Sequence, residues 1–139
     1  MRVHLKFILF FTLILTGCSN NNNENSNPLS NTGLIGDWEI SGRGINNVSS
    51  LEAVCCETIK FIDDANTHDF KGTYIFDDSS GVVTNGIFTV DSDNGAIAYT
   101  TENDNSYILE YSLNSNVLEV WFFDGGNRNW TTYIKTSNI

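Results

Sequence analysis

The sequence predicts an all-β domain, an antiparallel up-and-down barrel of about eight strands. Two observations support this fold class. Apolar runs rich in β-branched and aromatic residues recur after residue 33, and clusters of Asp, Asn, Gly and Ser separate them. Within several of these runs, apolar and polar residues alternate. Short polar connections favour antiparallel neighbours, and alternation places one face of a sheet against a core.

The strand predictions follow the apolar runs in chain order. They cover residues 36–41, 57–62, 72–76, 82–90, 96–101, 106–113, 117–124 and 130–136. The clusters between most of them contain Asn and Asp, which hydrogen-bond to their own backbone, and Gly, which adopts left-handed conformations freely. Residues 42–56 carry no clear strand signal, and they could form a loop or a short helical turn.

Alternation indicates which faces of the strands contact water. In the run 106–113, Leu109 and Tyr111 share a face opposite Glu110 and Ser112. Strands in this number must close into a barrel or split into a sandwich. A sandwich usually needs longer connections between its two sheets, so the short hairpins favour the barrel.

The N-terminus has the features of an exported chain. Arg2 and Lys6 precede an apolar run over residues 7–15. This run is shorter than the about 20 residues that a membrane-spanning helix needs. It fits the apolar region of a secretory signal peptide instead.

Residues 15–18, Leu-Thr-Gly-Cys, resemble the lipobox of bacterial lipoproteins. The resemblance implies that residues 1–17 are removed and that Cys18 is acylated, which anchors the protein in a membrane. Ser19 stands in place of the Asp that favours inner-membrane retention in some bacteria, so we expect the outer membrane. Residues 18–32, rich in Asn and Ser, are predicted to be a flexible tether, and residues 33–139 to be the β domain.

The charge of the chain excludes one class of partner. The sequence has 7 basic and 17 acidic residues, and loss of Arg2 and Lys6 leaves 5 basic residues and a formal net charge of −12. Binding to nucleic acid requires a basic surface, so we expect no nucleic-acid partner. The acidity is consistent with solubility of an exported domain.

The start and the end of the β domain carry a resemblance to a known family. Gly36-Asp37-Trp38 resembles the Gly-x-Trp signature that opens the first strand of lipocalin-like domains. The final segment, residues 130–135, is similar to the last strand of bacterial lipocalin-like lipoproteins. The resemblance implies an up-and-down barrel in which Gly36, Trp38 and Lys135 are structural, with Lys135 packed on the Trp38 ring. This chain departs from the pattern in having Lys135 rather than Arg, and adjacent rather than separated cysteines.

Aromatic residues are the candidate ligand-binding groups. Seven of them would line or fill the barrel: Tyr74, Phe76, Phe88, Tyr99, Tyr107, Tyr111 and Phe122. An eight-stranded barrel is either filled by its own side chains or holds one small ligand. We expect a non-enzymatic domain that binds a small apolar or amphipathic molecule. The alternative is a filled barrel that docks on another envelope protein through exposed Trp121 and Phe123.

Few residues could support catalysis or bind a metal. His68 is the one histidine after the predicted signal peptide, and no G-x-S-x-G motif is present. We therefore expect no enzymatic activity, no cofactor and no metal site. Residues 91–95, Asp-Ser-Asp-Asn-Gly, begin like a calcium-binding loop, but the strands that flank them predict a hairpin turn.

Cys55 and Cys56 are adjacent in the sequence. On a strand they would point to opposite faces, which disfavours both a shared metal and a disulfide. One thiol is expected to point inward as a small apolar group. A strained bridge or a free thiol in an oxidising compartment stays open.

Overall fold

The computed structural model describes residues 27–51, 55–66 and 68–137, so the predicted signal peptide and Cys18 lie outside the described residues. Within the described ranges the elements are a short helix, α1 (Pro28–Asn31), and the strands β1 (Gly36–Ile45), β2 (Val48–Ser49), β3 (Thr58–Asp63), β4 (Lys71–Asp77), β5 (Val83–Asp91), β6 (Ala96–Thr101), β7 (Ser106–Asn114), β8 (Val117–Asp124) and β9 (Asn127–Ser137). Each of the eight predicted strands is present.

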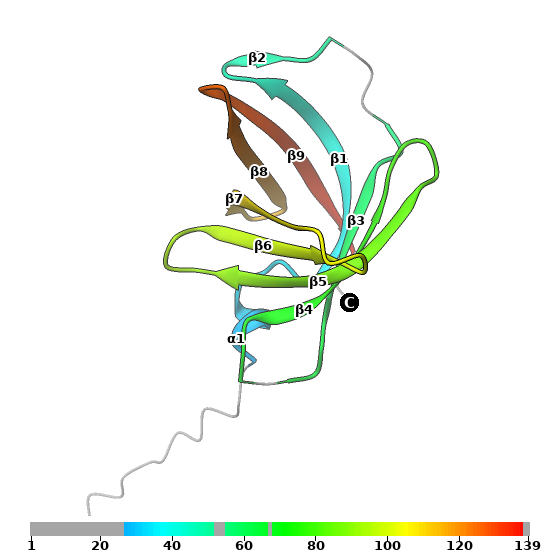
Figure 1. Cartoon of the computed structure of the whole chain (residues 1–139), viewed down its shortest axis with the longest axis vertical. Helices are drawn as coiled ribbons and strands as arrows, with labels where there is room; N and C mark the ends of the chain where they lie inside the picture. Colours follow the sequence, from blue (N-terminus) through cyan, green and yellow to red (C-terminus); the bar gives the residue numbers. More distant parts are fainter. Residues whose placement is uncertain (1–26, 52–54, 67, 138–139) are drawn as a thin grey trace, which may run out of the picture.

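All strands form one antiparallel sheet in the order β2-β1-β3-β4-β5-β6-β7-β8-β9, and β1 also pairs with β9. This last pairing closes β1 and β3–β9 into an eight-stranded barrel, with β2 added outside the closure (Figure 1). The predicted up-and-down barrel is confirmed, and the sandwich alternative is wrong. Closure pairs the free edges of β1 and β9, which would otherwise be open to association with other chains.

The polar clusters form the expected hairpin turns. Between β5 and β6, the Asp91 carboxylate accepts hydrogen bonds from the backbone N–H of Asn94 at 3.1 Å and from its side-chain amide at 2.7 Å. Gly95 follows with φ of +63°, a conformation that glycine adopts without steric cost. The hairpin prediction for residues 91–95 is confirmed.

Residues 42–56 differ from the expected loop or helical turn. β1 continues to Ile45 and returns through β2, while residues 52–54 lie outside the described part of the chain. The sequence around Gly42 and Gly44 lacks an apolar strand signal. β9 nevertheless supplies the partner, because Gly44 pairs with Trp130 and Ile45 with Asn129.

Residues 27–32 correct the predicted tether. Asn27 caps α1 by accepting a hydrogen bond from the Leu29 N–H at 2.9 Å, and Pro28 occupies the first turn, where its missing N–H is not needed. The Leu29 side chain is fully buried in the barrel core. Composition alone predicts a solvated segment here, but a single leucine that docks into the core is enough to order its end.

The helix α1 marks one end of the barrel. Asn27 contacts Asp63 at the end of β3, and Figure 1 shows α1 beneath β4 and β5, far from the β1–β2 and β8–β9 turns. We refer to the end that carries α1 as the α1 end. The opposite end, at the β1–β2 and β8–β9 turns, holds a cavity that is described below, and we refer to it as the cavity end. In the described part of the chain, no helix is long and apolar enough to cross a membrane.

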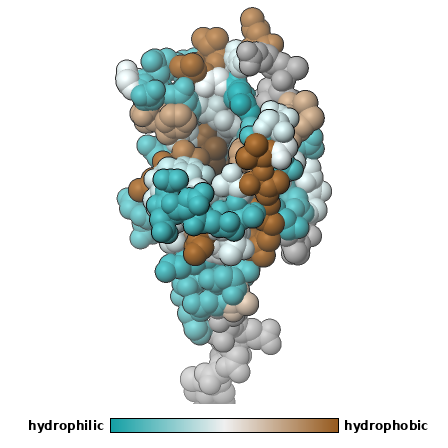
Figure 2. Space-filling model, turned by 45° about the vertical axis from the view of Figure 1, so that its right-hand side comes forward, coloured by the Kyte–Doolittle hydropathy of each residue, from teal (hydrophilic) through white to brown (hydrophobic). Residues whose placement is uncertain are grey.

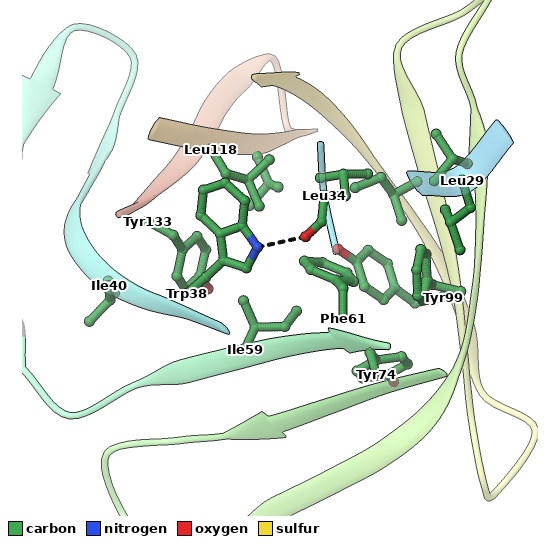
Figure 3. Packing of buried hydrophobic residues seen from close by; sticks show 14 residues of the cluster. Leu29, Leu34, Trp38, Ile40, Ile59, Phe61, Tyr74, Tyr99, Leu118 and Tyr133 are labelled. Carbon is green, nitrogen blue, oxygen red and sulfur yellow. Dashed lines mark hydrogen bonds between the residues drawn. The ribbon is translucent and has the colours of Figure 1, made fainter. Parts of the chain in front are cut away.

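Trp38 lies at the centre of the buried residues near the α1 end (Figure 3). Its indole N–H donates a hydrogen bond to the Leu34 carbonyl at 2.8 Å, so its one polar atom is satisfied inside the core. Beyond it, Phe61 and Phe88 pack edge to face with ring centroids 4.9 Å apart. Such aromatic pairs contribute about 0.5–1.5 kcal/mol beyond the burial of their area.

The three predicted signature residues come together in the structure. The Lys135 ammonium lies 5.2 Å from the centroid of the Trp38 ring and donates a hydrogen bond to the Gly33 carbonyl at 2.8 Å. Gly36 has φ of +137°, and a Cβ atom there would lie 2.5 Å from the Ser137 carbonyl oxygen and 2.7 Å from the Lys135 Cε. A larger residue at position 36 would therefore clash with the β9 backbone as well as with Lys135, which gives the glycine a physical role.

We predict that Leu29→Ala lowers the free energy of unfolding by about 2–5 kcal/mol, because it opens a cavity beside a fully buried side chain. Urea denaturation followed by circular dichroism would measure the change. Leu51→Ala is the matched control, since Leu51 is fully exposed, and it should change stability by less than about 0.5 kcal/mol. Equal effects of the two substitutions would show that α1 does not contribute to the core.

Candidate functional site

A cavity of about 480 Å³ occupies the barrel at the end opposite α1. This volume lies within the about 300–1,000 Å³ range of small-molecule sites. Its lining is mostly apolar, with few polar groups: Arg43, Gly44, Ile45, Ser50, Ile59, Phe76, Tyr99, Tyr107, Leu109, Leu118, Val120, Trp121, Phe122, Asn129, Trp130, Thr131 and Tyr133. The barrel is thus neither wholly filled nor wholly hollow.

The seven predicted aromatic residues divide between the cavity and the core. Phe76, Tyr99, Tyr107 and Phe122 line the cavity. Tyr99 and Tyr107 stack with ring centroids 5.0 Å apart and planes 10° from parallel, so the Tyr107 ring lies over the Tyr99 ring, which is 2% exposed.

The other three predicted aromatics do not line the cavity. Phe88 is fully buried, and Tyr74 is 1% exposed and packs edge to face on Tyr99. Tyr111 is half-buried near the β5–β6 turn at the α1 end, where its backbone N–H bonds to the Gly95 carbonyl. Alternation predicts that these side chains point inward, but it does not predict how deep in the barrel they lie.

A bulge in β1 brings a charged residue into the cavity. Ile40 pairs with Tyr133, but Gly42 pairs with Thr132, so Ser41 is an extra residue on β1. An extra residue reverses which positions face inward. Arg43, which simple alternation from Ile40 would place outside, therefore lies on the inner face.

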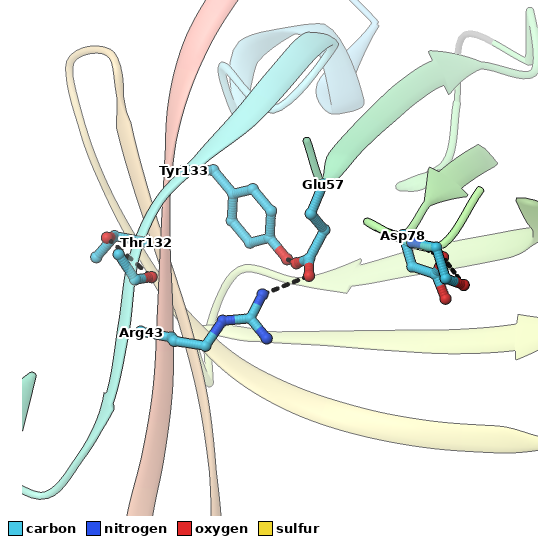
Figure 4. A network of polar contacts seen from close by, with 7 residues as sticks. Arg43, Glu57, Asp78, Thr132 and Tyr133 are labelled. Carbon is cyan, nitrogen blue, oxygen red and sulfur yellow. Dashed lines mark hydrogen bonds and ion pairs between the residues drawn. The ribbon is translucent and has the colours of Figure 1, made fainter. Parts of the chain in front are cut away.

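Arg43 binds a buried carboxylate at the cavity wall. Its Nη2 lies 2.5 Å from Glu57 Oε2, and the Tyr133 hydroxyl donates a hydrogen bond to Glu57 Oε1 at 2.6 Å. Figure 4 shows Arg43 from β1 and Tyr133 from β9 converging on Glu57, just before β3. Only 11% of the Glu57 side chain is exposed, against 45% of the Arg43 side chain. The acid is therefore held inside while the guanidinium is partly open to the cavity.

Three tyrosines of the cavity wall are harder to ionise than free tyrosine. Burial raises the pKa of Tyr99, Tyr107 and Tyr133, and Glu57 adds to the effect at Tyr133 because it accepts a hydrogen bond from the neutral hydroxyl. The hydroxyls therefore stay neutral at physiological pH. They offer hydrogen-bonding groups in the cavity without adding charge.

Trp121 and Phe123, which the sequence predicts to be exposed, lie near the β8–β9 turn, but Trp121 is half-buried. Trp121 donates a hydrogen bond to Glu110 at 3.0 Å and is covered by Arg128, whose guanidinium carbon lies 4.3 Å from the ring centroid. Arg128 also pairs with Glu119 at 2.5 Å. Phe123, in contrast, is 61% exposed. On the face of the molecule shown in Figure 2, hydrophobic residues gather in a few places among hydrophilic ones.

The structure places the remaining candidate residues away from the cavity. His68 is exposed in the connection between β3 and β4, and no ion pair joins it to a carboxylate among the described residues. In the same part of the chain, no group of three or more His, Cys, Asp or Glu side chains could hold a metal ion.

Cys55 and Cys56 overturn two expectations. Both are exposed, so neither thiol points inward, and their Sγ atoms lie 2.6 Å apart rather than on opposite faces. The reason is that they precede β3 and do not belong to a strand, and Cys56 has φ of +69°. Contact with the Cys55 thiol raises the pKa of Cys56.

Sequence reasoning missed Arg43 and Glu57. Arg43 lies between two glycines in a segment with no strand signal, and Glu57 looks like an ordinary polar residue at the start of a strand. The spacing between Ile40 and Arg43 is odd, so simple alternation assigns Arg43 to the outer face. The pairing with β9 was needed to detect the bulge.

Comparison with known proteins leaves the fold and the site as the basis for function. A scan against models of protein families finds no match for this chain. A search of curated protein sequences likewise finds no significantly similar sequence.

We predict that Arg43→Met lowers the free energy of unfolding by about 1–3 kcal/mol, because it leaves the buried Glu57 carboxylate without its cation. The double variant Arg43→Met/Glu57→Gln should lose less stability than the sum of the losses of the two single variants, as expected for coupled groups. Urea denaturation of the three variants would give the coupling energy.

Arg128→Met is the matched control for this prediction. The Arg128–Glu119 pair has the same 2.5 Å separation, but 31% of each side chain is exposed. Such an exposed pair contributes less than about 1 kcal/mol. If the stability losses of Arg43→Met and Glu57→Gln were additive, Arg43 and Glu57 would not stabilise the fold through their contact.

We also predict that the protein loses stability as the pH rises above about 10. The pKa values of Tyr99 and Tyr133 are raised on folding, so the unfolded chain ionises first. The stabilisation is fully present below the unfolded pKa and disappears as the pH climbs towards the folded pKa. Urea denaturation at about pH 8 and about pH 11 would measure the loss.

Tyr99→Phe should reduce this alkaline loss, because it removes one tyrosine that ionises only in the unfolded chain. Tyr111→Phe is the comparison, since Tyr111 is only half-buried and its pKa is raised less. A pH dependence that is unchanged by Tyr99→Phe would refute this assignment.

Proposed function

We propose that the protein is a lipid-anchored envelope lipoprotein whose lipocalin-like barrel binds a small apolar or amphipathic molecule. The observation that carries this proposal is the cavity of about 480 Å³ at the end of the barrel opposite α1. A cavity of this size with a mostly apolar wall and few polar groups is typical of small-molecule sites.

The arrangement of the wall favours an amphipathic ligand over a purely apolar one. The Tyr107 ring, which stacks on buried Tyr99, and Leu109 offer a surface for an apolar body. Arg43 supplies the positive charge of the wall, and its bond to Glu57 uses one guanidinium nitrogen. A polar or acidic group of the ligand would therefore lie near Arg43.

The proposed anchor fits the direction in which the chain enters the barrel. Asn27 and α1 lie at the α1 end, so an acylated Cys18 would attach the protein from that side. The cavity would then lie at the end away from the attachment. An outer-membrane location rests on the sequence after Cys18 and is part of the same proposal.

A second candidate is a module that docks on another envelope protein. It is favoured by apolar residues at the cavity end, where Val48, Val82 and Phe123 are 71%, 58% and 61% exposed. The filled barrel that this alternative assumed does not agree with the cavity. Cover of Trp121 by Arg128 also reduces the aromatic area that a partner could contact.

Native mass spectrometry of the purified full chain is the direct test, and we expect a retained small molecule. For a site-specific test, we predict that Leu109→Trp weakens binding of an amphipathic fluorescent dye about tenfold or more, because the indole fills the cavity. Dye titration by fluorescence would measure the dissociation constant, with circular dichroism as the check on folding.

Ile108→Trp is the matched control for this substitution. Ile108 is the preceding residue of β7, points outward and is 67% exposed, so the same bulk is added outside the barrel. It should leave the dissociation constant unchanged. Equal weakening by both variants, or by neither, would count against binding in the cavity.

A further inference from the structure

Cys55 and Cys56 have a geometry that the proposed ligand site does not explain. Both thiols are exposed in the loop before β3, and their Sγ atoms lie 2.6 Å apart. A disulfide has an S–S distance of about 2.05 Å, so the sulfurs need to approach by only about 0.5 Å to bond. The thiols of these neighbouring residues thus face each other instead of pointing to opposite sides of the chain.

The backbone around the pair is adapted to this contact. Adjacent Cα atoms are about 3.8 Å apart, which is shorter than the about 4.4–6.8 Å of ordinary disulfides. A ring between neighbours is therefore strained unless the backbone adopts an unusual conformation. Cys56 has φ of +69°, which is uncommon for a residue other than glycine.

The residue that follows fixes the pair to the barrel. The Glu57 carbonyl accepts a hydrogen bond from the Ile40 N–H at 3.0 Å, and its side chain binds Arg43 and Tyr133. The C-terminal side of the pair is thus held by β1 and β9. Folding, rather than the local sequence alone, keeps the two thiols in contact.

We propose that Cys55 and Cys56 form a reversible redox site that exchanges with disulfide-bonded oxidants. One cysteine thiolate attacks the S–S bond of the oxidant, forms a mixed disulfide and releases one thiol. The second cysteine attacks this mixed disulfide, closes the ring and releases the other thiol. The two cysteines lose two electrons and two protons, and the oxidant gains them as two thiols.

Exposure gives this site its expected character. Exposed disulfides are more easily reduced than buried structural ones, and they are the labile or regulatory type. The site would therefore switch between dithiol and ring as the surrounding redox balance changes. This inference is independent of whether the cavity binds a ligand.

Peptide mapping of the full chain tests the proposal. Trypsin cleaves after Arg43 and Lys60, so one peptide, residues 44–60, contains both cysteines and excludes Cys18. After incubation with oxidised glutathione and alkylation of free thiols, we expect this peptide to have lost two hydrogens and to carry no alkyl group. Reduced glutathione should restore the dithiol. A peptide with bound glutathione, two alkyl groups or a bond to the Cys18 peptide would overturn the proposal.

Two controls separate the role of the fold from simple proximity. Cys55→Ser and Cys56→Ser should each retain glutathione as a mixed disulfide, because neither has a second thiol to release it. We compare the ratio of oxidised to reduced glutathione at which half of the chain is oxidised. This ratio should be on the order of tenfold lower for the folded chain than for the chain unfolded in urea. Equal ratios in the two states would show that the folded geometry does not favour the ring, which would also overturn the proposal.

Discussion

Closure of the sheet between β1 and β9 is the interaction on which the rest of the structure depends. The pairing is not uniform, because the register shifts once between Asp37 and Trp38 and again between Ile40 and Gly42. The first shift leaves Lys135 opposite Trp38 at the α1 end, and the second turns Arg43 towards the inside. The same seam therefore completes the hydrogen bonding of the barrel, positions its central tryptophan and determines the charge of its cavity. Side chains from the other strands fill part of the space that this pairing encloses.

The interior has two parts built from similar residues. Near the α1 end, Trp38, Phe61 and Phe88 pack closely, and Leu29 of α1 belongs to the same buried cluster. Towards the other end, aromatic residues such as Tyr99 and Tyr107 line open space instead. α1 adds the apolar volume of Leu29 at one end only. Protein interiors normally pack to the density of organic crystals, and a cavity of about 480 Å³ in a small barrel departs from that density.

The sequence was sufficient for the strands, the turns and the barrel, because alternation and turn residues are local signals. It also predicted the contact of Lys135 with Trp38 and four of the aromatic residues in the cavity. It was not sufficient for α1, since the surroundings of Leu29 resemble a solvated tether, or for Arg43 and Glu57. The inward position of Arg43, and with it the contact to Glu57, depends on a one-residue shift in the pairing of β1 with β9, which no local pattern records. The facing thiols of Cys55 and Cys56 were missed because a strand was assumed where the chain forms a loop.

The extra residue at Ser41 has a consequence for how such a protein could evolve. Without it, Gly42 would follow Ile40 directly, and Arg43 would lie two positions after an inward residue, so Arg43 would face the cavity either way. The bulge therefore lets β1 take up one extra residue without changing which side chains line the cavity. Gain or loss of one residue at this point is a genetic step that leaves the cavity wall intact, whereas the same step in a strand without a bulge would reverse its two faces. Related barrels should accordingly be compared by the identity of their lining residues, whatever the length of this strand.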